Sequence, residues 1–204
     1  MSDLNRPVAT PSQTVGPFFH FGLATNGALG RVAGPNETGE RITLRIRVLD
    51  GDGVPVPDAL VEIYHADASG AYPRPRSEPA SHGGFTGFGR LPTDPDGSCL
   101  FETIRPGTVH GSDGVQAPHI NVCVLARGLL RQLYTRIYFA GDEGHDEDPI
   151  LRLVPADRAR TLIAQCQSRS ERATTPGTGR GSREPTWEFT LRLQGADETV
   201  FFDL

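Results

Sequence analysis

The 204-residue chain lacks any apolar run long enough to cross a membrane, and it has no excess of basic charge. A membrane-spanning helix needs ~20 apolar residues. The 20 Lys and Arg stand against 25 Asp and Glu, and the formal net charge of -5 argues against a general nucleic-acid binder. No apolar signal segment opens the chain, which favours a cytoplasmic protein. Cysteine is scarce, and Cys99, Cys123 and Cys166 lack metal-site spacing, so we expect reduced thiols.

Several signatures of common enzyme chemistry are also missing. The chain has no phosphate-cradling glycine loop, no CxxC pair, and no order of Ser, His and Asp that suggests a hydrolase. Residues 140–148 are rich in carboxylates, but their order does not match a calcium-binding loop, so we expect a solvated loop there.

Glycine and proline are plentiful instead, with 24 and 17 copies, which suits a chain of many turns. Short segments between these turns alternate apolar and polar residues, as half-buried strands do. We predict strands at 42–49, 59–65, 98–104, 119–126, 132–139, 187–193 and 199–202, and one helix at 157–165. The pattern predicts an all-β protein. We expect a single β-sandwich domain over residues 41–204, with long loops and one short helix. An extended N-terminal arm over residues 1–40 precedes this domain.

The strand at 119–126 is the centre of the prediction. Ile120, Val122 and Val124 fall on one face, and His119 and Asn121 fall on the other. Two side chains spaced this way can hold a metal when both are His, and here the second is Asn. A hydrogen-bonded His119 is therefore expected.

The arm has no sustained periodicity, but it carries a cluster of Phe18, Phe19 and Phe21 after a run of turn-forming residues. So long an irregular segment must lie against something to be ordered. Two surfaces are open to it: its own domain, or a partner chain.

Motifs along nearly the whole chain, in order, resemble the iron-free subunit of heteromeric enzymes in the intradiol ring-cleaving dioxygenase family. Any one motif is weak, and the ordered set is specific. The matching segments are residues 10–18, 62–67 with Gly70 and Tyr72, 88–90, 104–107, 117–121, 125–128, 135–139 and 194–203.

The resemblance implies a paired chain, the β subunit, which shares the sandwich and holds Fe(III) through two Tyr and two His. This sequence departs from that ligand set. Asn121 stands at the second His, Val109 stands near one expected Tyr, and the loop from Pro73 to Phe88 contains no Tyr. Tyr72 opens that loop with no second Tyr near it. The resemblance therefore implies that the partner, and not this chain, holds the iron.

For this chain the resemblance implies a share of the substrate pocket, at Thr14, Gly16, Pro17, Phe18 and Arg127. The implied reaction inserts O₂ into 3,4-dihydroxybenzoate to give 3-carboxy-cis,cis-muconate, and only the assembled α/β hetero-oligomer is active. An Arg fork suits a substrate carboxylate. The alternative for Arg127 is a structural salt bridge. The alternative for the whole chain is a non-enzymatic β-sandwich binding module, because turns like those of residues 50–59 also occur in such modules.

Overall fold

The computed structural model describes residues 9–16, 18–73, 84–167 and 184–203. Eight strands are hydrogen-bonded in the continuous order β3-β2-β7-β8-β9-β10-β1-β4, and β5 and β6 form a separate hairpin. The strands are β1 (Arg41–Leu49), β2 (Leu60–His65), β3 (Phe88–Pro92), β4 (Ser98–Ile104), β5 (Val109–Gly111), β6 (Gly114–Gln116), β7 (His119–Leu125), β8 (Leu133–Phe139), β9 (Ile163–Gln167) and β10 (Thr186–Arg192).

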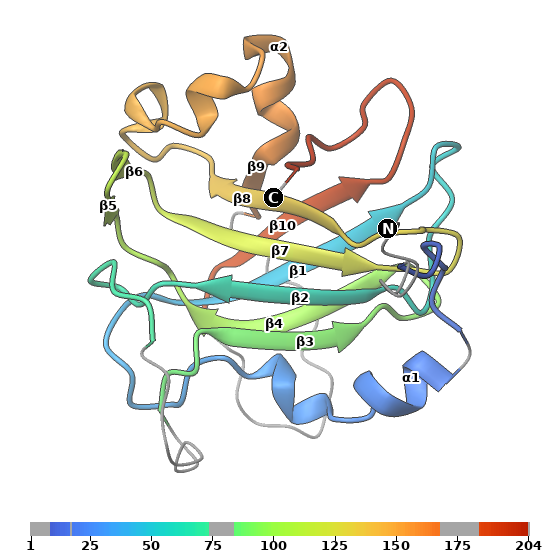
Figure 1. The fold of residues 1–204 in the computed structure, drawn as a ribbon. Coiled ribbons are helices and arrows are strands. Elements are labelled where there is room, and N and C mark those ends of the chain that lie inside the picture. The colour runs from blue at the N-terminus through green and yellow to red at the C-terminus, as the bar shows by residue number, and fades with distance from the viewer. Residues whose placement is uncertain (1–8, 17, 74–83, 168–183, 204) are drawn as a thin grey trace, which may run out of the picture.

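The eight strands fold over on themselves as two layers. One layer contains β3, β2, β7 and β8, and the other contains β10, β1 and β4 (Figure 1). Strand β9 joins them, because it pairs with β8 at only two positions and with β10 at three. The predicted β-sandwich is thus confirmed.

The core lies between the layers and is supplied by the alternating positions of the strands. Ile42, Leu44, Ile46 and Val48 of β1 are fully buried, and so is Ile120 of β7. Full burial of each such side chain stabilises the fold by about 1.5–3 kcal/mol. The inward faces predicted for these two strands are therefore correct.

The helix predicted at 157–165 is helical only as far as residue 162 and is wrong for residues 163–165. The segment forms α2 (Ala156–Ala159), then the 3-10 helix η4 (Arg160–Leu162), and then strand β9. Strand β9 hydrogen-bonds to both layers, so tertiary pairing satisfies its backbone better than a continued helix would.

The arm is less irregular than predicted, since it contains a helix, α1 (Phe18–Leu23), and a 3-10 helix, η1 (Gly27–Gly30). After η1 the chain packs onto its own sandwich. Val32 and Ala33 are fully buried in the core, and the N–H of Val32 donates to the carbonyl of Glu102 at 2.9 Å.

Three further segments differ from the sequence-based expectation. Strand β3 and the β5–β6 hairpin are not among the strands predicted from the sequence, and 199–202 makes only an isolated bridge, Tyr134 to Phe202. The acidic segment contains the 3-10 helix η2 (His145–Glu147) and is followed by η3 (Leu151–Leu153). Its last residue, Asp148, is fully buried and accepts hydrogen bonds from backbone N–H groups of Ala117, Ile150 and Leu151, so this loop is not simply solvated.

Two other expectations concern the cysteines and the membrane. All three cysteines are free, as expected. Among the residues that the structure describes, no helix is both long and apolar enough to span a bilayer.

Candidate functional site

The described part of the arm meets the body of the protein where β7 ends. The backbone N–H of Gly128 donates to Oγ1 of Thr14 at 2.7 Å. Gly128 has φ +96°, a conformation that favours glycine. The left-handed turn after β7 therefore presents its N–H to the arm.

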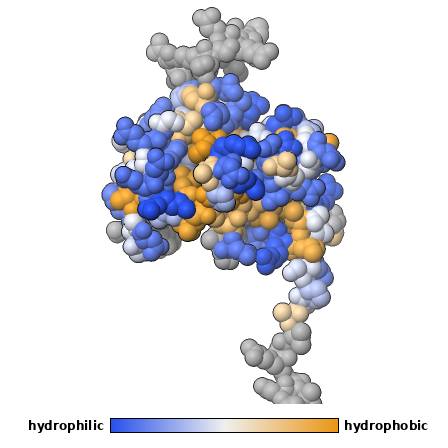
Figure 2. Space-filling view, turned by 90° about the horizontal axis from the view of Figure 1, so that it is seen from above, coloured by the Kyte–Doolittle hydropathy of each residue, from blue (hydrophilic) through white to orange (hydrophobic). Residues whose placement is uncertain are grey.

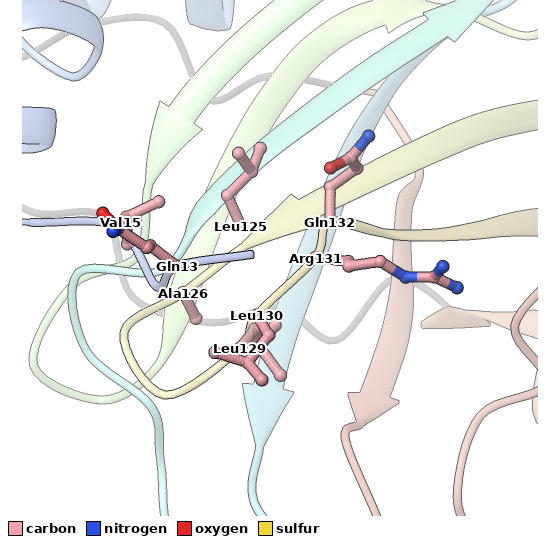
Figure 3. A pocket seen from close by; sticks show the side chains of 8 residues that line it. All are labelled: Gln13, Val15, Leu125, Ala126, Leu129, Leu130, Arg131 and Gln132. Carbon is pink, nitrogen blue, oxygen red and sulfur yellow. The ribbon is translucent and has the colours of Figure 1, made fainter. Parts of the chain in front are cut away.

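Beside this contact lies a small pocket between the arm and the β7–β8 connection (Figure 3). Its volume of about 80 Å³ is well below the ~300–1,000 Å³ of complete ligand sites. This pocket by itself is therefore too small to be a complete ligand site. The pocket is lined by Gln13, Val15, Leu125, Ala126, Leu129, Leu130, Arg131 and Gln132.

Arg127 precedes the glycine of this turn. Its side chain is 66% exposed, and Nη2 lies 3.8 Å from Oδ2 of Asp58. The other oxygen of Asp58, Oδ1, lies 2.6 Å from Nδ1 of His20 in α1. One carboxylate thus contacts both the arm helix and the cation after β7. The structural pairing considered for Arg127 exists, but its length and exposure leave the guanidinium open to other acceptors.

The structure brings some of the sequence-predicted site residues together and leaves others apart. Thr14 reaches the residue next to Arg127. The carbonyl of Gly16 accepts from the N–H of Phe19 at 3.1 Å as the arm enters α1, and Phe18 is 83% exposed. Pro17 lies outside the described residues.

Sequence reasoning missed His20 and Asp58. Asp58 lies in the turn-rich segment 50–59, and His20 lies between Phe19 and Phe21 of the arm. The only signals in the sequence were two polar side chains beside turn and aromatic motifs. Their contact could not be read from a local pattern, because the two residues are 38 positions apart.

His119 and Asn121, which stand at the two histidine positions that the resemblance implies, belong to a chain of hydrogen bonds. Nδ1 of the buried His119 donates to the carbonyl of Ala117 at 2.8 Å, so Nε2 accepts from the hydroxyl of Tyr72 at 3.1 Å. Asn121 donates to the Tyr72 oxygen at 2.8 Å and to the carbonyl of Tyr64 at 3.1 Å. Tyr64 stacks on Tyr72 with ring centroids 5.1 Å apart, so Tyr72 does have a second tyrosine beside it.

This donor set does not fit a ferric ion held by two phenolates and two imidazoles. Burial lowers the pKa of His119 to about 4 and raises the pKa of Tyr72. An amide replaces the second imidazole, and the free lone pair of His119 is used by the Tyr72 hydroxyl. Within the described ranges, no three His, Cys, Asp or Glu side chains are grouped as metal ligands.

The outer face of the β2–β7–β8 layer carries a pocket of about 490 Å³, and Tyr64 and Asn121 of this chain of hydrogen bonds are part of its lining. Its lining is mainly apolar. Tyr64 is 40% exposed there and Leu153 is 77% exposed. The face of the molecule in Figure 2 likewise carries hydrophobic surface bordered by hydrophilic residues. Exposed apolar areas of this kind mark contact surfaces.

Comparisons with known proteins agree over most of the chain. A family model described as Dioxygenase matches residues 15–195. The protocatechuate 3,4-dioxygenase alpha chain of Burkholderia cepacia is 40% identical, covering 96% of this chain and 97% of that protein. The beta chain from the same organism is 33% identical over 79% of this chain and 67% of its own length. Among solved structures, catechol 1,2-dioxygenase from Pseudomonas arvilla C-1 has a TM-score of 0.62 and 26% identity, over 82% of this chain and 56% of that chain.

Proposed function

Because the chain belongs to the intradiol ring-cleaving dioxygenase family, we propose that it is the α subunit of a protocatechuate 3,4-dioxygenase. It completes a substrate pocket in a β subunit and has no iron of its own. The observation that carries the proposal is the convergence of Thr14 and the Arg127–Gly128 turn at one end of the sandwich. In a chain similar to an alpha chain over nearly all its length, an arm and a cation that lie next to each other support a shared role in substrate binding.

The proposed reaction adds both atoms of O₂ to 3,4-dihydroxybenzoate. The bond between the two hydroxyl-bearing carbons breaks, and the product is 3-carboxy-cis,cis-muconate. The substrate keeps one carboxylate throughout. Fe(III) of the partner β subunit would supply the oxygen chemistry. In this chain His119, Tyr72 and Asn121 hydrogen-bond to one another, which is why we assign Fe(III) to the partner.

The share of this chain is to bind and orient the substrate. Arg127 carries a guanidinium, whose forked donors suit the substrate carboxylate. Thr14 holds the arm beside it, and Gly16 lets the backbone approach a flat ring closely. The arm pocket has a volume of only about 80 Å³, so a partner must complete the wall. Once that wall is closed, water is displaced and the contact between the guanidinium and the carboxylate strengthens.

We assign the partner contact to the arm and to the outer face of the β2–β7–β8 layer. Phe18 and Phe21 of α1 are 83% and 70% exposed, and the outer pocket adds apolar area on the same molecule. Obligate interfaces typically bury more than about 2,000 Å². The exposed rings of Phe18 and Phe21 and the apolar pocket on the outer face of the β2–β7–β8 layer are the kind of surface that such an interface buries.

The test is co-expression of this chain with a sister sandwich chain that carries His-x-His and two loop tyrosines. We expect one co-purifying complex on size exclusion that consumes O₂ with 3,4-dihydroxybenzoate. A stable monomer that ignores the sister chain contradicts the proposed assembly. A complex that forms but cleaves no dihydroxybenzoate contradicts the proposed activity and returns the binding-module alternative.

A further inference from the structure

Asp58 has an unusual backbone. Its φ is +59°, and among the described residues it is the only non-glycine at positive φ. Asp and Asn tolerate this left-handed region better than most residues, but the conformation still carries strain. Strain of this kind persists only where the surrounding structure holds it, and it gathers at functional positions.

The buried Thr93 holds this turn in place. The N–H of Asp58 donates to the carbonyl of Thr93 at 3.0 Å, and the N–H of Ala59 donates to its Oγ1 at 2.9 Å. The same hydroxyl donates to the carbonyl of Val56 at 2.7 Å. Three hydrogen bonds to one threonine thus fix the backbone on both sides of Asp58. The Asp58 carboxylate is therefore attached to a well-fixed backbone.

From that point the carboxylate reaches two elements that carry the proposed site. Oδ1 lies 2.6 Å from Nδ1 of His20 in the arm helix, and Oδ2 lies 3.8 Å from Nη2 of Arg127 after β7. Its side chain is 33% exposed, so water screens the pair with Arg127 only in part. We propose that Asp58 is a positioning residue for substrate binding, which holds Arg127 and the arm helix in one frame. This proposal rests on the function proposed above.

The physical reason lies in the freedom of the arginine. A long side chain that is 66% exposed samples many rotamers, and ordering it when substrate arrives weakens binding. Asp58 restricts that sampling before substrate arrives. A guanidinium has five N–H donors, so a contact through Nη2 leaves donors for the substrate carboxylate.

The test uses Asp58→Asn in the co-expressed α/β complex. Asn keeps the size of the side chain and tolerates the left-handed backbone, so the turn survives while the charge is lost. We expect KM for 3,4-dihydroxybenzoate to rise about twofold to fivefold, the range of an exposed ion pair. We expect kcat, the iron content and the KM for catechol to stay unchanged. The Asn oxygen can still accept from Nδ1 of His20 and keep the arm helix in place, and catechol has no carboxylate for the clamp to bind. Asp52→Asn is the matched control, since it removes an exposed charge from the same connection.

A double variant separates positioning from a general effect of charge. If Asp58 acts through Arg127, Asp58→Asn adds no further rise in KM to Arg127→Ala. Additive effects, an unchanged KM, or a lower KM in Asp58→Asn overturn the inference, and a lower value means that Asp58 only competes with substrate. All of these outcomes are measured on a wild-type complex that is active. A wild-type complex that assembles but cleaves no substrate would instead contradict the proposed function.

Discussion

Oγ1 of Thr14 lies 2.7 Å from the backbone nitrogen of Gly128, and this hydrogen bond joins residues 114 positions apart. It ties the described start of the arm to the residue that follows Arg127. The arm and the cation therefore occupy one end of the sandwich in the chain by itself. The proposed substrate wall is in this respect formed before a partner closes it.

Replacing Thr14 with Val removes the acceptor for the Gly128 N–H while keeping the shape of the side chain. The site is exposed and water can satisfy the N–H, so we expect less than about 1 kcal/mol of lost stability. We expect faster amide hydrogen exchange in residues 9–16 and a higher KM for both 3,4-dihydroxybenzoate and catechol, because the arm contacts the ring and not the carboxylate. Thr25→Val, at another exposed threonine of the arm, is the control. Exchange equal to wild type would mean that this hydrogen bond does not hold the arm.

Arg127→Ala removes the proposed carboxylate clamp. A charge-assisted contact in a partly closed pocket contributes roughly 1.5–3 kcal/mol. We expect KM for 3,4-dihydroxybenzoate to rise about tenfold or more, with little change for catechol and none in iron content. Steady-state kinetics with both substrates measure this, and the control is Arg160→Ala, which removes an arginine that is 65% exposed and does not line the arm pocket. Equal losses for the two substrates would assign Arg127 a structural role only.

The chain purified alone is expected to bind no stoichiometric iron and to lack the visible absorption of tyrosinate bound to iron. The reason is the donor set, since Asn121 replaces an imidazole and Tyr72 keeps its proton in a bond to His119. Metal analysis and a visible spectrum after incubation with iron provide the measurement. One tightly held iron per chain, with that colour, would falsify the assignment of the ion to the partner.

Two buried histidines predict a loss of stability in acid. Burial lowers the pKa of both His65 and His119 from 6.5 to about 4. Between these values the unfolded chain binds protons that the folded chain does not. Stability is therefore fully present above about pH 6.5 and falls as the pH drops towards 4, by up to ~1.4 kcal/mol per pH unit for each histidine.

The measurement is the thermal midpoint of the co-purified protein across this pH range at fixed protein concentration. His65→Gln is the variant, because Gln can still donate to the carbonyl of Ala66, which lies 2.8 Å from His65 Nδ1. We expect a shallower decline than in wild type. His110→Gln, at an exposed histidine, should leave the decline unchanged. If wild type and His65→Gln decline in parallel, His65 does not titrate as its burial requires.

Much of the fold is readable from the sequence because a strand's two faces alternate locally. The inward residues of β1 and β7 follow from period two alone, and the structure buries them. Strand β9 is the counter-example. Its few residues follow a helical turn directly, and only pairing with β8 and β10 makes them a strand. The short helix α1 likewise lies in a segment without helical periodicity.

The sequence by itself determined the sandwich, the family resemblance, and the departure of Asn121 from the expected ligand set, since these depend on residue type and order. Only the tertiary structure decided which residues meet. It placed Thr14 against Gly128, stacked Tyr64 on Tyr72, and aimed Asp58 at both His20 and Arg127. No local pattern encodes such contacts, because they arise when distant turns are brought to one end of a packed core. The contacts of Asp58 with His20 and Arg127 could not be predicted from the sequence for that reason.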